Sequence, residues 1–298
     1  MGELITEREI GFLPHPIGAE VKYDGEWNLA VRGSDFYMIN KYNTVRRENP
    51  FLQDLLRIFG DTEFEIVGEL APRDPMTPFN EFLKLARKGK WDLLEFRIFD
   101  VRKFDSTDFS AIPYIERRKF LEKKICGKET EFVKLTEMIL SDSPRKTLSF
   151  YRNAIDRGYE GVMLKPLQSL SEKAWIKVKP ELEMDVVVLG VTKGRQSFLI
   201  GVYDNGSIRR IGKVAIPDDR LYCAVKRLAE KYLQGEDDNF LYLPPKLVIQ
   251  VAYMELIPSK KYDGFSLRFP RFVRIRKDKR ASECTVNQIP ERLLKKIG

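Results

Sequence analysis

The sequence predicts two domains, an α+β domain followed by a domain built mainly from β-strands. The chain has 298 residues, and one domain commonly takes roughly 100 to 200. Runs with strand-like alternation and runs with helical spacing are mixed in the first part, whereas strand-like runs dominate after Met184. The predicted boundary lies in the polar, proline-containing segment 179–183, so the expected domains are residues 1–181 and 182–298.

The first domain is expected to mix strands and helices. Residues 19–31 indicate two strands joined by an Asp24-Gly25 turn, the usual sequence signal of a hairpin. Further strands are predicted at residues 35–42, 64–71, 93–101 and 160–166. Helices are predicted where apolar residues recur at helical spacing, in three cases followed by a glycine, at residues 51–60, 80–89, 115–125 and 143–158.

Five β-rich runs make up the second domain, and one helix, at residues 220–233, interrupts the third and fourth of them. This order is typical of an oligonucleotide-binding (OB) barrel, a five-stranded Greek-key fold. In the last run, Val273 and Ile275 are expected to face the barrel, with Arg274 and Arg276 pointing outward. The runs are residues 184–192, 197–204, 207–216, 246–257 and 272–277.

The composition indicates a folded protein with a polyanionic partner. Lys and Arg number 52 against 44 Asp and Glu, and 43% of the residues are hydrophobic. That hydrophobic content excludes a disordered chain, and the net charge of +8 favours a polyanion as partner. The sequence has neither an apolar run of membrane-spanning length nor a signal peptide, so we expect an intracellular protein of the cytoplasm or nucleoid, without a membrane partner.

Scarce residue types exclude several kinds of chemistry. The three cysteines lie far apart without a CxxC spacing, which argues against a disulfide framework and a zinc cluster. His15 is the only histidine, which excludes Ser-His-Asp and Cys-His catalysis and most histidine-ligated metal sites. Any catalysis must therefore use Lys, Arg, Asp and Glu.

Lys22 opens the motif Lys-Tyr-Asp-Gly at the end of a predicted strand, beside a tight turn. A rigid backbone there can direct the amine into a cleft, and a deprotonated lysine is a nucleophile. Neighbouring cations lower a lysine pKa, and Lys165, Lys177 and Lys179 are candidates for such neighbours. Standing alone, the motif is more often an ordinary turn beside a solvated lysine.

Further motifs follow Lys22 in order along the chain. Taken singly, each has an ordinary explanation, such as a core phenylalanine, an exposed carboxylate or a half-buried strand. They are Glu69 in EIVGEL, Phe99 and Asp100 in FRIFDV, Glu160 to Lys165 in EGVMLK, Lys177 and Lys179 in WIKVK, and RFPRFVRIRKDK at 268–279. Together they resemble the nucleotidyltransferase motifs of ATP-dependent DNA ligases in their archaeal and eukaryotic form, from about Glu20 to the C-terminus.

This resemblance implies an adenylation (nucleotidyltransferase) domain followed by an OB-fold domain, and it implies a role for several residues. Lys22 would attack the α-phosphate of ATP, release pyrophosphate and carry AMP on its amine. Glu20 and Val21 would help to read the adenine edge, and Phe99 would stack on the base.

The resemblance also implies charged groups around the phosphates. Lys177 and Lys179 would neutralise the α-phosphate in the transition state. Glu69 would hold the ribose or a metal ion, and Glu160 would help to bind the metal, expected to be Mg²⁺ with Mn²⁺ as a substitute. Three cations of the second domain would bind the pyrophosphate leaving group: Arg274, Lys277 and Lys279.

Two positions depart from the family pattern. Trp27 stands where the family has an arginine, and Asn40-Lys41 stands where it usually has Ser-Arg. Both changes affect contacts with the nucleic acid and the adenylate sugar rather than the nucleophile, so Arg32 or Lys41 would have to supply the missing charge to DNA. Only 21 residues precede Lys22, so a minimal two-domain form, or a fragment of a larger chain, is expected.

The resemblance predicts an ATP-dependent DNA ligase that seals 5′-phosphate/3′-hydroxyl nicks in double-stranded DNA and acts as a monomer. An RNA or mixed-substrate ligase is an alternative, as is a capping-type guanylyltransferase, although the ending RFPRFVRIRKDK argues against the latter. A non-catalytic nucleic-acid-binding protein is the other alternative, but binding alone would not need Lys22, Glu69, Glu160 and the lysine pair together. The sequence identifies no recruiting protein.

Overall fold

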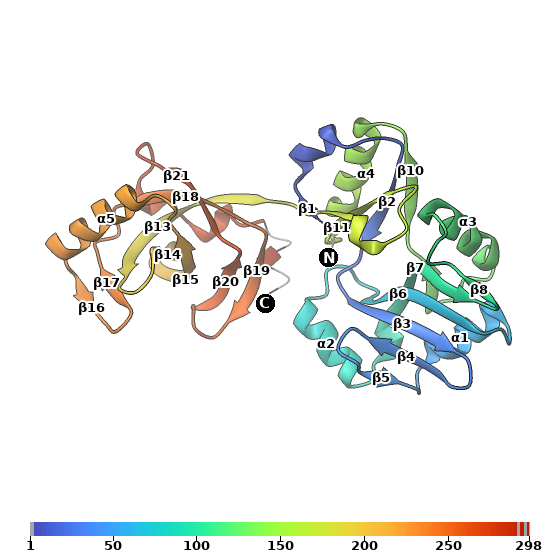
Figure 1. The fold of residues 1–298 in the computed structure, drawn as a ribbon. Helices are drawn as coiled ribbons and strands as arrows, with labels where there is room; N and C mark the ends of the chain where they lie inside the picture. Colours follow the sequence, from blue (N-terminus) through green and yellow to red (C-terminus); the bar gives the residue numbers. More distant parts are fainter. Residues whose placement is uncertain (1–2, 291–292, 295–296, 298) are drawn as a thin grey trace. The chain divides into compact units, whose positions relative to one another are not determined.

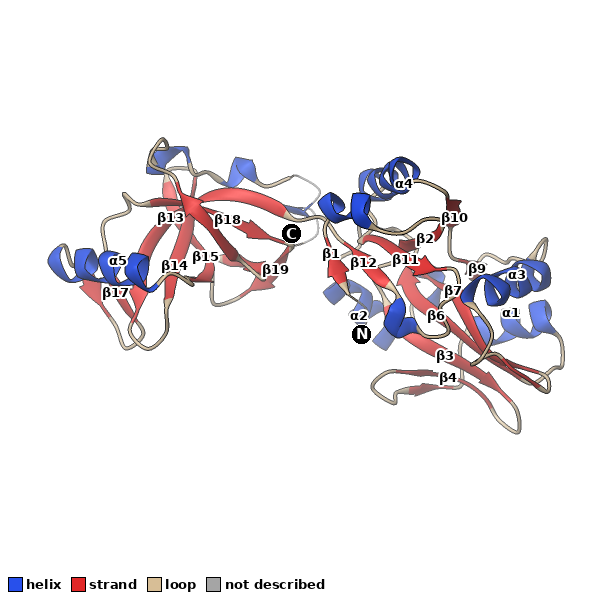
Figure 2. Ribbon diagram, turned by 45° about the horizontal axis from the view of Figure 1, so that its top comes forward, coloured by secondary structure: helices blue, strands red, loops and turns tan. Residues whose placement is uncertain are grey.

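The computed structural model describes residues 3–290, 293–294 and 297. The chain divides into two compact units, Met1–Pro180 and Glu181–Gly298 (Figure 1). The first unit mixes helices and strands, and the second is mainly β (Figure 2). The predicted fold class, an α+β domain followed by a β domain, is confirmed. Among the described helices, none is long and apolar enough to cross a membrane.

A five-stranded sheet forms one half of the first unit. Its order is β1-β12-β11-β2-β10; β1 and β12 are parallel, and the other neighbours are antiparallel. Helix α4 (Pro144–Asp156) packs with the short 3-10 helix η1 (Glu7–Phe12) on one face. The strands are β1 (Leu4–Ile5), β2 (Ile17–Lys22), β10 (Met138–Ser141), β11 (Gly161–Pro166) and β12 (Ile176–Val178).

A seven-stranded sheet forms the other half of the first unit, in the order β5-β4-β3-β6-β7-β8, with β9 beside β7. Its helices, α1 (Pro50–Phe59), α2 (Phe79–Arg87) and α3 (Tyr114–Ile125), share one hydrophobic core with one face of this sheet. The strands are β3 (Glu26–Arg32), β4 (Phe36–Asn40), β5 (Val45–Arg46), β6 (Phe64–Pro72), β7 (Leu94–Phe104), β8 (Thr107–Asp108) and β9 (Val133–Leu135). Two 3-10 turns, η2 (Trp91–Leu93) and η3 (Glu172–Ala174), complete the unit.

The helix predicted at residues 51–60 shows why these local predictions hold. Pro50 occupies the first turn of α1, and the side chain of Asn49 accepts a hydrogen bond from the Leu52 amide, 3.2 Å long. Gly60 ends the helix with φ 73°, a conformation that glycine adopts readily. The start and end signals therefore both lie in the sequence.

The predicted hairpin around Asp24-Gly25 is wrong. β2 belongs to the five-stranded sheet and β3 to the seven-stranded one, so the turn carries the chain from one sheet to the other. A β-carbon at position 25 would collide with the carbonyl oxygen of Leu70 in β6, so only glycine fits. The sequence signal for a tight turn was correct, but it does not reveal that each strand has other partners.

The second unit is a β domain around one core, with α5 (Asp219–Lys231) packed against it. The pairings β13–β14, β14–β15, β15–β21, β21–β18 and β18–β13 form a circuit, closed at β15–β21 by the single pair Ala215 and Arg271. This agrees with the predicted OB fold. The strands are β13 (Leu182–Thr192), β14 (Ser197–Asp204), β15 (Ser207–Ala215), β16 (Gly235–Glu236), β17 (Phe240–Tyr242), β18 (Val248–Tyr253), β19 (Glu255–Ser259), β20 (Gly264–Arg268) and β21 (Arg271–Ile275).

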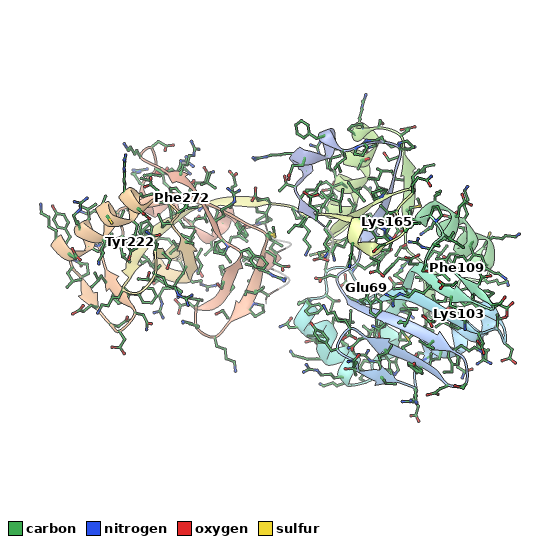
Figure 3. The ribbon with its side chains drawn as sticks, viewed as in Figure 1. Glu69, Lys103, Phe109, Lys165, Tyr222 and Phe272 are labelled. Atoms are coloured by element: carbon green, nitrogen blue, oxygen red, sulfur yellow. The ribbon has the colours of Figure 1, made fainter. Side chains whose placement is uncertain are left out.

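Details of the second unit differ from the prediction. The run 246–257 splits into β18 and β19, and β19 pairs with β20 as a separate two-stranded sheet. In β21 the register shifts, so Phe272 and Ile275, rather than Val273, pack against the core (Figure 3). Two 3-10 turns, η4 (Ala281–Glu283) and η5 (Val286–Gln288), follow.

Candidate active site

Strand alternation places the candidate residues of the five-stranded sheet on one face. In β2, Ala19 and Val21 belong to the core beside α4, so Glu20 and Lys22 point to the opposite face. Val21 can therefore reach that face only through its main chain. β11, β12 and the residue after β12 alternate in the same way and add Met163, Lys165, Lys177 and Lys179.

Lys22, Glu160 and Lys179 form one ion cluster. One carboxylate oxygen of Glu160 pairs with Lys22 Nζ and the other with Lys179 Nζ. The side chains of Lys22 and Glu160 are only 19% and 13% exposed. Gly161, the next residue, has φ 151°, and a β-carbon there would collide with the carbonyl oxygen of Val178. Glycine at this position therefore lets the carboxylate reach both amines.

The ion cluster fixes the charge of its members. Burial acts to raise the pKa of Glu160, but Lys22 and Lys179 outweigh it and hold that pKa at about 2. Burial acts to lower the pKa of Lys22, but Glu160 and Glu69 outweigh it and raise that pKa above its ordinary value. The expectation of a lowered pKa for Lys22 is thus wrong for this state, because the nearby carboxylates outweigh burial, the cause that acts to lower it.

Glu69 lies on β6 near the same amine. Burial raises the pKa of Glu69 to about 8; Lys22 opposes this increase, and Glu160 and Asp24 add to it. Among the described residues, no group of three or more His, Cys, Asp or Glu could enclose a metal ion. Two carboxylates facing one amine nevertheless fit a hard divalent cation that keeps water ligands or takes phosphate oxygens.

Phe99 reaches the site through an irregularity of β7. Between Val67 and Gly68 of β6 the register shifts, and Phe99 is the residue of β7 without a partner. Such a bulge redirects a side chain relative to regular alternation. The ring lies edge-on to Trp175, with centroids 5.8 Å apart. The sequence indicated this phenylalanine by its motif alone and gave no sign of the bulge.

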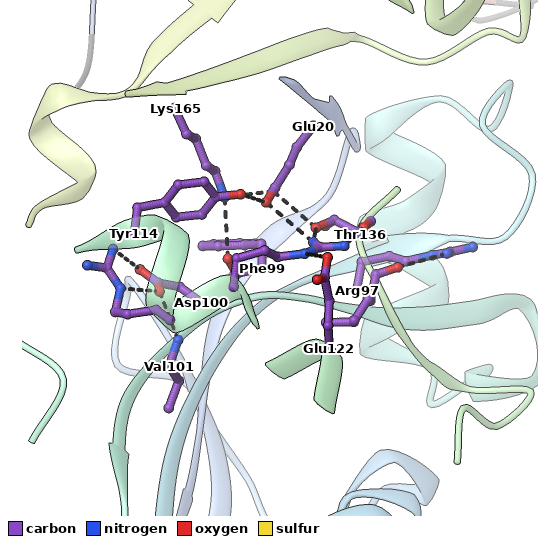
Figure 4. A network of polar contacts seen from close by, with 12 residues as sticks. Glu20, Arg97, Phe99, Asp100, Val101, Tyr114, Glu122, Thr136 and Lys165 are labelled. Atoms are coloured by element: carbon purple, nitrogen blue, oxygen red, sulfur yellow. Dashed lines mark hydrogen bonds and ion pairs between the residues drawn. The ribbon is translucent and has the colours of Figure 1, made fainter. Parts of the chain in front are cut away.

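A buried network surrounds Glu20 (Figure 4). One carboxylate oxygen accepts from Tyr114 Oη and lies 3.5 Å from Arg118 Nη1; the other accepts from Thr136 Oγ1 at 3.0 Å and Lys165 Nζ at 2.6 Å. A carboxylate has about four acceptor positions. A base edge would therefore have to compete with donors of the protein for the Glu20 side chain.

Lys165 is the buried cation of this network and is only 1% exposed. Its Nζ lies 3.8 Å from the centroid of the Trp175 ring and 4.9 Å from that of Phe99, and it donates to the Phe99 carbonyl at 3.3 Å. It thereby ties the five-stranded sheet to β7 (Figure 4). Trp175 and Tyr114 were not among the site residues expected from the sequence; the signal for the tryptophan was its position just before the lysine pair.

Of the other candidate cations in the first unit, two lie near Lys22 and one does not. Burial, Lys22 and Lys179 lower the pKa of Lys177, and Lys41 lowers it further. The structure therefore brings Lys177 and Lys41 to the cluster around Lys22. Arg32 is not brought there, since it pairs with Asp61 at the far end of β3, opposite Phe64.

The candidate pyrophosphate-binding cations of the second unit lie on β21 and in the segment that follows it. Arg274 is exposed and its Nε donates to Gln250 at 2.7 Å. Lys279 lies 3.4 Å from Asp185, and Lys277 is exposed. Arg276 was expected to point outward, but it binds both carboxylate oxygens of Asp185, at 2.7 and 2.9 Å.

Comparisons with known proteins show the family to which the chain belongs. The family model for the ATP-dependent DNA ligase domain matches residues 10–179, and the model for the ATP-dependent DNA ligase C-terminal region matches residues 191–279. The DNA ligase of Thermococcus fumicolans is 33% identical over an alignment that covers 91% of this chain and 54% of the relative. The chain spans about half the length of the curated relatives it matches.

Solved structures of the same family share the fold. The ligase domain of LigD from M. tuberculosis gives a TM-score of 0.51 at 22% identity, covering 96% of this chain and 98% of that one. A Lig E DNA ligase gives a TM-score of 0.59 at 16% identity, covering 93% and 98%. Both similarities extend over the two units of this chain.

Proposed function

Because this chain belongs to the ATP-dependent DNA ligase family, we propose that it seals 5′-phosphate/3′-hydroxyl nicks in double-stranded DNA with ATP. One observation carries the proposal: the amine of Lys22 lies at a strand end against Glu160, which also binds Lys179. A nucleotidyl transfer needs a nucleophile held among charges that can stabilise a phosphate in its transition state.

The first step forms a covalent lysyl-AMP. The Lys22 amine attacks the α-phosphorus of ATP, the bond from that phosphorus to the bridging oxygen breaks, and pyrophosphate leaves. Lys22 must first lose to solvent the proton that its ion pair with Glu160 stabilises, and it gives a second proton to solvent as its bond to phosphorus forms. Its reactivity therefore depends on weakening that ion pair. Lys177 and Lys179 then stabilise negative charge on the α-phosphate oxygens.

Glu160 and Glu69 are the residues that would hold a divalent cation, Mg²⁺ or Mn²⁺. When bound, such a cation supplies positive charge to the phosphates. Engagement of Glu160 in this way would weaken its pairing with Lys22 and lower the lysine pKa. The ion cluster would therefore couple the reactivity of Lys22 to occupation of the site.

Two further steps complete sealing. An oxygen of the 5′-phosphate at the nick attacks the adenylyl phosphorus, and the bond to Lys22 Nζ breaks, which leaves AMP on the DNA end. The 3′-hydroxyl then attacks the 5′-phosphate, forms the phosphodiester and releases AMP. The first of these steps brings together two phosphates that are already negative, and in the second a hydroxyl attacks a negatively charged phosphate, so cations such as Lys41 and Lys177 are expected at the acceptor side.

The two units would divide this work. Residues 1–181 would act as the adenylation domain and 182–298 as the OB domain. Three cations of the OB domain would assist departure of pyrophosphate in the first step: Arg274, Lys277 and Lys279. We further expect a monomer that acts in the cytoplasm or nucleoid.

A sealing assay tests the proposal. The full chain, ATP and Mg²⁺ are incubated with a labelled duplex that carries one nick, and the products are separated under denaturing conditions. We expect a longer labelled strand on nicked DNA and none with Lys22→Ala. Sealing only of nicked RNA would identify an RNA ligase, and binding without sealing would contradict the proposed activity.

A further inference from the structure

Trp27 is a partly exposed residue of β3 in the first unit. On β3 it is the register partner of Glu69 on β6, so both side chains lie on the sheet face away from the helices. It is partly exposed and belongs to none of the hydrophobic core clusters. Trp27 is therefore not a buried core residue.

Arg102 lies against the Trp27 ring. Its guanidinium carbon is 5.1 Å from the ring centroid, within the range of a cation–π contact. Arg102 is the unpaired residue of the second register shift in β7, where Val101 and Lys103 face consecutive residues of β6. The two bulges of this strand thus each present one side chain, Phe99 and Arg102, outside the regular alternation.

The charge of Arg102 remains available. Its side chain is 48% exposed, and its ion pair with Glu172 is long, at 3.5 Å. Lys177 and Arg102 both line a cavity of about 790 Å³, together with Met163 and Trp175. An anion that enters this cavity beside Lys177 can therefore replace the Glu172 carboxylate at the guanidinium.

We propose that Arg102, held against Trp27, binds the 5′-phosphate of the nick while AMP is transferred to it. This inference rests on the proposed ligase function. Lys177 and Lys179 are assigned to the α-phosphate, whereas Arg102 lines the same cavity as Lys177 and can bind a second phosphate there. A guanidinium offers two parallel donors to such a phosphate, which a lysine cannot.

Transfer of AMP to the 5′-phosphate needs the positive charge of the Arg102 guanidinium. A 5′-phosphate oxygen forms a bond to the adenylyl phosphorus, the bond from that phosphorus to Lys22 Nζ breaks, and the released amine takes a proton from solvent. Two negative phosphates thereby become one pyrophosphate linkage. A cation on the incoming phosphate reduces their repulsion before the bond forms. The first step has no incoming DNA phosphate, so it does not use Arg102.

Single-turnover measurements on the full chain separate the steps. Self-adenylation is followed with labelled ATP, and AMP transfer is followed by mixing the adenylated protein with a nicked duplex. For Arg102→Ala we expect AMP transfer to fall by about tenfold or more, with self-adenylation unchanged within about twofold. In the double variant Trp27→Arg/Arg102→Ala, a guanidinium is restored beside Glu69, and transfer is expected to recover most of the loss.

Arg47→Ala is the matched control. Arg47 also lies over a ring, that of Tyr37 at 5.6 Å, and pairs with an acid, Asp35, at 2.8 Å, but it does not line the cavity. An equal loss in both steps for Arg102→Ala, an equal effect of Arg47→Ala, or no recovery in the double variant would overturn the inference. Failure of the proposed function looks different, because the unaltered protein would then either form no adenylate or transfer no AMP to a nicked DNA duplex.

Discussion

Glu69 is the residue whose protonation links the site to stability. With a pKa near 8 in the folded protein, it keeps a proton that an unfolded glutamate loses near pH 4.5. The folded state therefore binds more protons between these values, and its stability falls as pH rises from about 5 to 8. Glu160 does not contribute in this window, because its lowered pKa acts only in more acidic solution.

Glu69→Gln removes this titration. We expect the variant to lose less stability than the unaltered protein between about pH 5 and 8, by on the order of a few kcal/mol. Denaturant unfolding at several pH values measures the effect. Parallel curves for the two proteins would show that Glu69 is ionised throughout and would refute its raised pKa.

Lys41 is close enough to Glu69 and Lys177 to lower the pKa of both groups. Lys41→Ala should cost nick sealing on the order of tenfold more than self-adenylation, about 1.4 kcal/mol of transition-state stabilisation. Lys119→Ala, on an exposed side of α3, serves as control and should leave both rates unchanged. Equal losses in the two reactions would instead assign Lys41 to the ATP site.

At the scale of elements, β1 supports the strand that carries the lysine pair. The amide of Lys177 donates to the Glu3 carbonyl at 2.7 Å, and the amide of Lys179 donates to the Ile5 carbonyl at 3.3 Å. Ile5 is 5% exposed and packs in the core beside α4. Its packing therefore fixes where the two catalytic candidates stand.

Ile5→Ala should lower the free energy of unfolding by about 2–5 kcal/mol and slow self-adenylation. Leu4→Ala is the matched control, since Leu4 is 42% exposed and exposed substitutions usually change stability by less than about 0.5 kcal/mol. Thermal unfolding and labelling with ATP give the two readouts. A destabilised Ile5→Ala protein that labels at the full rate would show that β1 does not position the lysine pair.

The sequence predicts elements far better than it predicts their pairing. Helices such as α1 and α4 carry their own start and end signals, and the motif order identified Lys22 and Glu160. The split of β2 and β3 between two sheets depends on partners distant in sequence, which no local pattern encodes. The bulges that present Phe99 and Arg102 arise from the match between β6 and β7, so neither strand reveals them alone.

At the scale of the whole molecule, the second unit is proposed to act on the first step of the reaction. Arg274→Ala/Lys277→Ala should slow self-adenylation by about tenfold or more, because two cations expected on pyrophosphate are lost. Sealing of a nick that already carries AMP should change much less. Arg227→Ala, an exposed residue of α5, controls for loss of basic charge.

The opposite pattern, with normal self-adenylation and poor sealing of the adenylated nick, would assign Arg274 and Lys277 to DNA binding alone. Binding through the basic surfaces of the molecule would weaken as salt rises, as for other proteins that contact DNA phosphates. The two rates should therefore be compared at one fixed salt concentration.

The proposed ligase mechanism depends above all on Lys22 as the residue that carries AMP. The most direct measurement incubates the full chain with ATP and Mg²⁺, digests it under mildly alkaline conditions that preserve a phosphoramidate, and locates the added AMP by mass spectrometry. We predict the modification on Lys22 and its complete loss in Lys22→Ala. AMP on another residue, or no AMP on any residue, would contradict the proposed mechanism.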